Sequence, residues 1–220
     1  MPEITLYLAN GACSLAAHLL LEEIGIPYTA VVMKWDKSGL AAADGSINAD
    51  EYRRTIHHAS QVPALKVDNE VITENPAILT FISTLSPGRN LTGKTALENA
   101  RVAEWLAWIS GTLHETAFGM MFHSGRYSDN ESEHAHIQEK GRQRVLAAYR
   151  TIEKALEKKG FPVGEAETLV DYFTVPFWHW GDKFGIGLTS FPNYTRLVKR
   201  IEAKESAKCV LQAESVEPAL

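Results

Sequence analysis

The sequence predicts a mixed α/β domain followed by an all-helical domain, and three observations lead to this prediction. The first 85 residues alternate short apolar strands with amphipathic helices. Turn-forming residues gather at 86–90, where the helical patterns on both sides stop. Beyond this point apolar residues recur at helical spacing. We therefore expect domains at residues 1–85 and 95–220, joined by a linker at 86–94.

The first strand is the apolar run at residues 4–8, which breaks at a turn containing Gly11. A helix should follow, because leucines recur on one face, and it should end at Gly25. Cys13 stands where this helix begins. Free backbone N–H groups and the helix dipole lower the pKa of a thiol there and attract anions. The alternative is that Cys13 is a small apolar residue packed beneath the turn.

A second strand is expected at 28–33 and a short helix near 51–58. The long connection between them should be a mobile flap. Lys37 lies in this connection, where it is either solvated or within reach of a ligand carboxylate. These elements form a βαβ unit with parallel strands.

A hairpin and a final helix complete the first domain. The hairpin should turn at Asp68-Asn69, because both residues tolerate the backbone angles of a tight turn. Pro63 begins its first strand, at a place where a cis peptide can be kept. Glu74 begins the helix, where an acidic side chain suits the dipole. The resulting βαβ–ββα order resembles the thioredoxin-like mixed sheet.

The second domain carries one helix cap that its sequence specifies. Thr168 and Asp171 have the spacing at which a threonine and an acid reciprocally satisfy the first amides of a helix. We assign both residues to folding. Pro176 falls inside the same helix and should kink it.

Composition excludes several classes of function. The chain has 220 residues, 45% of them hydrophobic, and a net charge of −5 without a long basic run, which argues against a nucleic-acid partner. No apolar stretch reaches roughly 18 residues, and the N-terminus lacks a signal pattern, so we expect a cytoplasmic protein with no membrane partner. Two cysteines cannot form a disulfide framework. The histidines lack the spacing of a metal site, so we expect no metal.

Three motifs follow one another along the chain, and their order is informative. They are Gly11 to Leu15 around the cysteine, Gln61 to Leu65 around the proline, and Thr73-Glu74 before an apolar helix. In this order the chain resembles the cytosolic glutathione transferases, most closely the cysteine-bearing bacterial beta class. The resemblance covers nearly the whole chain. It implies a thioredoxin-like glutathione-binding domain, an all-α domain with a hydrophobic substrate pocket, and a homodimer that serves detoxification.

The resemblance also implies an activity and a binding site. The enzyme would activate the thiol of glutathione, its co-substrate, for conjugation or thiol transfer to a small hydrophobic electrophile. Val62 would pair its backbone with the cysteinyl backbone of glutathione. Glu74 and the backbone N–H of Asn75 would take the γ-glutamyl end. The candidate binding residues are Gln61, Val62, Pro63, Glu74, Asn75 and, from the loop, Lys37.

Four residues are candidates for the catalytic step. Cys13 would lie over the glutathione sulfur, where the beta class can form a mixed disulfide. His114 matches a histidine that this class brings from the helical domain toward the sulfur; the alternative is a histidine satisfied on its helix face. Tyr7 lies late in the first strand, as the activating tyrosine of other classes does, or faces the core. Ser14 could donate to the thiolate or cap the helix.

The chain departs from the family pattern at four places. The pair His57-His58 stands where an Asn-Pro pair is common, and Asn75 replaces a small residue. Ala107 replaces an asparagine that helps to bind the γ-glutamyl group. Glu115 replaces a lysine, and an inward-pointing carboxylate there would repel a thiolate.

Three functions remain open on this basis. One is glutathione conjugation, with a pocket that contains Phe118, Met121, Phe122 and Tyr127. Another is a glutathione-dependent disulfide oxidoreductase that uses Cys13. The third is a non-enzymatic glutathione-fold protein that binds ligands or partners.

Overall fold

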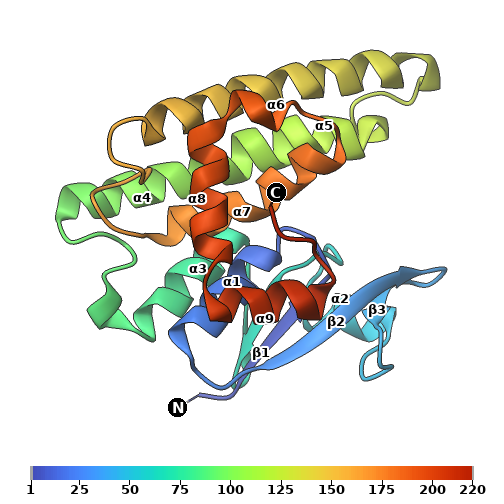
Figure 1. Cartoon of the computed structure of the whole chain (residues 1–220). Helices are drawn as coiled ribbons and strands as arrows, with labels where there is room; N and C mark the ends of the chain where they lie inside the picture. Colours follow the sequence, from blue (N-terminus) through green and yellow to red (C-terminus); the bar gives the residue numbers. More distant parts are fainter. Residues whose placement is uncertain (1, 220) are drawn as a thin grey trace. The chain divides into compact units, whose positions relative to one another are not determined.

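The computed structural model describes residues 2–219. These residues form two compact units, one made of residues 2–91 together with 201–219, the other of residues 92–200. Figure 1 shows the chain from its N-terminus in blue to its C-terminus in red. The predicted fold class is confirmed: the first unit is thioredoxin-like and the second is helical. The first unit also takes in the last 19 described residues, 201–219, which the sequence assigned to the helical domain. The predicted domain limits themselves stay a prediction.

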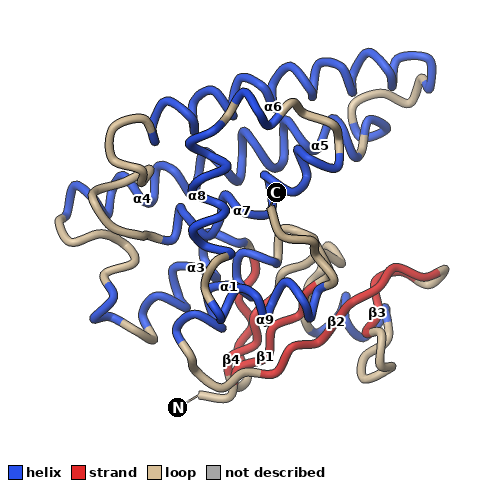
Figure 2. Tube along the Cα trace, in the orientation of Figure 1, coloured by secondary structure: helices blue, strands red, loops and turns tan. Residues whose placement is uncertain are grey.

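The first unit is built on a five-stranded sheet in the order β3-β2-β1-β4-β5 (Figure 2). Its strands are β1 (Ile4–Leu8), β2 (Thr29–Asp36), β3 (Gly39–Ala42), β4 (Ala64–Val67) and β5 (Glu70–Thr73). β1 pairs in parallel with β2, and the other neighbours are antiparallel. Leu6 on the central strand pairs with Ala30 and Leu65 and is fully buried. The hairpin at Asp68 is confirmed, with a positive φ of 52° at that residue.

The prediction of a mobile flap after the second strand is wrong, because β2 and β3 form a β-hairpin at this place. β2 continues to Asp36, and β3 returns antiparallel to it. The Asp36 carboxylate accepts hydrogen bonds from the backbone N–H groups of Ser38 (2.7 Å) and Gly39 (3.1 Å). Gly39 adopts a φ of 126°, a backbone angle that glycine adopts readily because it has no Cβ atom. The sequence pattern missed β3 because this edge strand pairs on one side and is rich in alanine.

Four helices belong to the first unit: α1 (Leu15–Ile24), α2 (Ala49–Thr55), α3 (Asn75–Thr84) and α9 (Glu205–Glu214). α1 packs against both α3 and α9, and Figure 1 shows α9, in red, beside α1. Gly25 ends α1 in the left-handed conformation, as the sequence predicts. The C-terminal helix therefore covers the helix that follows Cys13.

The second unit consists of helices. They are α4 (Ala96–Trp108), a π-helix (Ile109–Phe118), α5 (Gly119–Phe122), α6 (His134–Leu156), α7 (Leu169–Lys183) and most of α8 (Pro192–Glu202). The helical spacing expected for this part of the chain is present, but residues 109–118 are wound as a π-helix. π-Helical turns are often found at functional sites, and this one contains His114.

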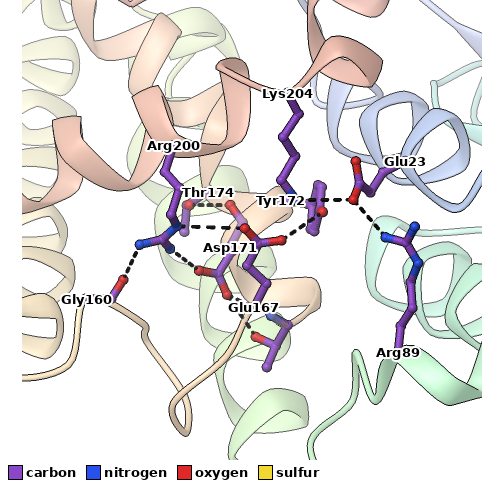
Figure 3. A network of polar contacts seen from close by, with 10 residues as sticks. Glu23, Arg89, Gly160, Glu167, Asp171, Tyr172, Thr174, Arg200 and Lys204 are labelled. Carbon is purple, nitrogen blue, oxygen red and sulfur yellow. Dashed lines mark hydrogen bonds and ion pairs between the residues drawn. The ribbon is translucent and has the colours of Figure 1, made fainter.

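The predicted capping box at the start of α7 is confirmed. The backbone N–H of Thr168 donates to the Asp171 carboxylate at 2.9 Å, and the cap is reciprocal. Arg200 extends the box: its guanidinium lies 2.9 Å from the other Asp171 oxygen and also donates to the carbonyl of Gly160 (Figure 3). The cap thus ties α7 to the loop before it and to α8.

Residues 2–219 lack two features. No helix among them is both long enough and apolar enough to cross a membrane. They also contain no group of three or more His, Cys, Asp or Glu side chains arranged to hold a metal ion.

Candidate functional site

The turn between β1 and α1 is held from within and by the C-terminal helix. The Ser14 hydroxyl accepts from the Ala9 N–H at 3.1 Å and donates to the Ala9 carbonyl at 3.2 Å. Ser14 makes no capping hydrogen bond, so that part of the prediction is wrong. Glu214, from α9, accepts from the backbone N–H of Gly11 at 2.8 Å and contacts Nδ1 of His18 at 2.7 Å. All of these contacts fix the position of Cys13.

Cys13 is buried beside β4. Its Sγ donates to the carbonyl of Val62 at 3.4 Å. Burial raises the pKa of the thiol to about 12, even though a hydrogen bond from the Asn75 side chain lowers it; the charge of Glu74 raises it further. The predicted lowering of the pKa is therefore wrong. Cys13 precedes α1, which begins at Leu15, and the cost of desolvating a thiolate outweighs the helix dipole.

The segment beside Cys13 has the conformation that the sequence predicts. The peptide between Val62 and Pro63 is cis, and β4 begins at the next residue, Ala64. The carbonyl of Gln61 accepts from the Tyr52 hydroxyl at 2.7 Å, which fixes the chain just before the cis peptide. Val62 is half-buried, and the Gln61 side chain is exposed.

The start of α3 completes the cluster. Glu74 occupies the N-cap position with a positive φ of 69°, which is strained for a residue with a side chain, and it is exposed. Asn75 is the first residue of the helix and is buried. Among the described residues, its Oδ1 has no hydrogen-bond partner. The structure thus brings together Cys13, Val62, Glu74 and Asn75.

Two other predicted residues lie elsewhere in the first unit. Tyr7 packs in the core with Met33, and its ring meets that of Tyr52 edge-on at 5.5 Å. Burial and the charge of Glu51 raise the pKa of the Tyr7 hydroxyl. The core-facing alternative therefore describes Tyr7 better than an activating role. Lys37 is exposed at the tip of the β2–β3 hairpin.

His114 lies in the second unit between two aromatic rings. Phe177 and Trp180, both from α7, have ring centroids 5.4 Å from the imidazole. Burial lowers the pKa of His114 to about 4, so the ring is neutral at pH 7. Glu115 points outward: its side chain is 64% exposed and lies 3.3 Å from Arg126. Arg126 is a partner that the sequence pattern gave no means of finding.

The residues predicted to form the substrate pocket divide into two groups. Phe118 is fully buried and Met121 nearly so, whereas Phe122 and Tyr127 are 39% and 43% exposed. Phe122 contacts Trp180 edge-on at 5.0 Å. A cavity of about 320 Å³ in this unit includes Met121. Its lining residues are Met121, Ala135, Gln138, Glu139, Arg142 and Phe184.

Known proteins resemble both parts of the chain. Residues 115–205 match the family model described as "Glutathione S-transferase, C-terminal domain". Glutathione S-transferase GST-4.5 of Xanthomonas campestris is 27% identical over 96% of this chain and 98% of its own length. A solved glutathione S-transferase from Xylella fastidiosa superposes with a TM-score of 0.86 at 26% identity, covering 98% of this chain and all of its own. A beta-class enzyme from Sphingomonas chungbukensis gives a TM-score of 0.82 at 27% identity, covering 97% and 100%.

Proposed function

We propose that this protein binds glutathione in its first unit and conjugates it to a small hydrophobic electrophile. The proposal follows from its membership of the cytosolic glutathione S-transferase family, near the bacterial beta class. The cluster of Cys13, Val62, Glu74 and Asn75 is the observation that carries this proposal. Each member suits one part of the tripeptide. The carboxylate of Glu74 suits the γ-glutamyl ammonium, the start of α3 suits its carboxylate, and the backbone at Val62 suits strand pairing.

Cys13 would act as a hydrogen-bond donor in this mechanism. The nucleophile in conjugation is the glutathione thiolate, which is a minor species at neutral pH unless the protein stabilises it. A thiol whose pKa is about 12 keeps its proton at pH 7, so the S–H of Cys13 can turn from the Val62 carbonyl to the ligand sulfur. His114 is neutral at the same pH and could accept a proton. Its approach to the sulfur rests on the family resemblance alone.

The two alternatives receive less support. A disulfide oxidoreductase would need Cys13 as a thiolate, and burial opposes that form. The relatives carry the name of glutathione S-transferases, which favours an enzyme over a non-enzymatic binding protein. We further propose that the protein is cytoplasmic, serves detoxification, and is a two-fold homodimer. Sedimentation at micromolar concentration tests the dimer, and a single monomeric species would contradict it.

Substitution of Glu74 tests the binding site. Glu74→Ala should weaken glutathione binding by roughly 1.5–3 kcal/mol, because it removes a hydrogen bond to a charged group. Isothermal titration calorimetry measures this loss directly. Glu70→Ala, at an exposed position on β5 of the same unit, is the matched control and should bind as the wild type does. Equal affinities for all three proteins would remove Glu74 from the site.

The two cysteines provide a test of the mechanism. Cys209 is exposed, whereas Cys13 is buried with a raised pKa. Without ligand, Cys13 should react with iodoacetamide at least about tenfold more slowly than Cys209, since the thiolate is the reacting form. Peptide mass spectrometry over a time course separates the two sites. Faster labelling of Cys13, together with turnover of a mixed-disulfide substrate but not of an aryl halide, would favour the oxidoreductase.

A further inference from the structure

The turn before Val62 contains a histidine whose ring takes part in the backbone structure. His57 is 4% exposed. Its Nδ1 accepts a hydrogen bond from the backbone N–H of Ala59 at 3.2 Å, and its carbonyl accepts from the N–H of Ser60 at 2.8 Å. An imidazole nitrogen accepts only when it carries no proton. This turn therefore holds His57 as the neutral ring with its proton on Nε2.

The same turn is tied back to α2. The backbone N–H of His57 donates to the carbonyl of Tyr52 at 2.9 Å, and Nε of Arg53 donates to the Ser60 hydroxyl at 3.1 Å. Ser60 has a φ of 51°, a left-handed conformation that a residue with a side chain keeps only where its surroundings hold it. Val62 follows two residues later, so the direction in which its backbone faces a ligand depends on this turn.

Protonation of the ring removes the acceptor at Nδ1. An imidazolium has an N–H on both nitrogens, so the new N–H would face the N–H of Ala59 and the hydrogen bond between them would be lost. We propose that His57 is a positioning residue for glutathione: its neutral ring holds Val62 in place for strand pairing with the tripeptide, and protonation of the ring releases it. The inference rests on the binding of glutathione at Val62 that is proposed above.

The groups around His57 decide where on the pH scale the release occurs. Burial and the ring of His58, stacked with a centroid distance of 5.6 Å, lower the pKa of His57, whereas the Glu74 carboxylate at the start of α3 acts in the opposite direction. From α2, Arg53 and Tyr52 reach the same turn. A γ-glutamyl ammonium at Glu74 would offset the carboxylate that favours the imidazolium, so bound glutathione should lower the pKa of His57 further. Affinity for glutathione is then highest with the neutral ring and falls as His57 takes up its proton.

The test compares the pH dependence of glutathione affinity in the wild type and His57→Asn by isothermal titration calorimetry. An asparagine oxygen accepts from the backbone N–H two residues later in the chain and does not titrate, so the variant keeps the turn at every pH. From about pH 7.5 to about pH 5, the affinity of the wild type should fall at least about threefold more than that of the variant. His136→Asn, an exposed change on α6, is the control and should follow the wild type. His58→Asn removes the like charge beside the ring and should move the loss of affinity to higher pH.

Two further measurements distinguish positioning from a purely structural role. Steady-state kinetics should place the difference between the wild type and His57→Asn in the KM for glutathione, with the same kcat at saturating glutathione, because the turn orients the bound substrate. NMR titration of the wild-type imidazoles needs no variant, so it remains decisive if His57→Asn does not fold. Saturating glutathione should lower the pKa of His57 in this titration.

The outcomes separate this inference from the proposed function. Parallel pH profiles in the wild type and His57→Asn, or a His57 titration that glutathione does not move, would overturn the positioning role while glutathione binding itself stood. A wild type that binds no glutathione at either pH would overturn the proposed function and this inference with it.

Discussion

The starts of α1 and α7 are both fixed by a buried acidic side chain, but the acid comes from different distances along the chain. At α7 the acid is Asp171, which accepts a hydrogen bond from the N–H of Thr168, three residues earlier in the chain. At α1 it is Glu214, 203 residues from the Gly11 N–H. The start of α7 therefore carries its own cap, whereas the turn before α1 depends on α9 remaining docked. Loosening α9 should free the turn that holds Cys13, and loosening α7 needs a change in the cap itself.

The largest effect should follow from removing the acid of the self-contained cap. Asp171→Ala leaves the guanidinium of Arg200 and the Thr168 N–H without their buried partner. The Asp171 side chain is fully buried but that of Arg200 is 32% exposed, so the loss should lie at the lower end of the range for buried pairs, about 3 kcal/mol of unfolding free energy. Urea unfolding followed by tryptophan fluorescence measures it. Glu165→Ala, which breaks an exposed pair with Lys159, should cost under about 1 kcal/mol. Similar losses in both variants would show that the cap is no stronger than a surface pair.

The cap should also make stability depend on pH. Burial raises the pKa of Asp171 to about 7 from 3.8. The folded state then holds the proton more tightly than the unfolded state, so this stabilisation is complete below about pH 4 and is lost as the pH rises through 7. His114 acts in the opposite direction. Its pKa, lowered from 6.5 to about 4, makes stability fall as the pH drops below 6.5.

Asp171→Asn separates these two contributions, because the variant keeps His114. The stability of the wild type relative to Asp171→Asn should decrease between pH 4 and 7 by on the order of 3 kcal/mol. Urea midpoints across this range provide the measurement. A difference that does not vary with pH would mean that Asp171 titrates equally in the folded and unfolded chains.

The long-range clamp should give a smaller effect at a different place. Glu214→Gln keeps the shape of the side chain but removes the charge facing His18, which should cost about 1.5 kcal/mol. Hydrogen exchange at the Gly11 N–H should accelerate, since its acceptor becomes weaker. Glu217→Gln, an exposed change near the same end of the chain, should alter neither property. Unchanged exchange at Gly11 in both variants would mean that α9 does not hold the turn.

The contrast between the two helix starts explains what the sequence could predict of the fold. Features that depend on a few neighbouring residues could be predicted from the sequence. They are the Thr168–Asp171 cap, the turn at Asp68 and the helix end at Gly25. The contact of Glu214 with Gly11 depends on the packing of α9 on α1. The edge strand β3 could not be predicted from the sequence either, because it is stabilised by its pairing with β2.

The candidate site follows the same rule. Family spacing predicted that Cys13, Val62, Glu74 and Asn75 act together, and the structure gathers them. The direction of the Cys13 pKa was predicted wrongly, because burial is a property of the folded chain. The inward turn of the Asn75 side chain was also not predictable, since a helix-start residue is ordinarily partly exposed.

The smallest effect should come from Ser14, which closes the turn before α1 within a local segment. Ser14→Ala removes both hydrogen bonds to Ala9 and should cost roughly 0.5–1 kcal/mol, a value comparable to the loss of a capping side chain. Because the hydroxyl is fully buried and engaged by Ala9, kcat for conjugation should remain near the wild-type value. Urea unfolding and steady-state kinetics on the same preparation measure the two quantities. A large fall in kcat with unchanged stability would instead make Ser14 a donor to the glutathione thiolate and would weaken the view that this turn is purely structural.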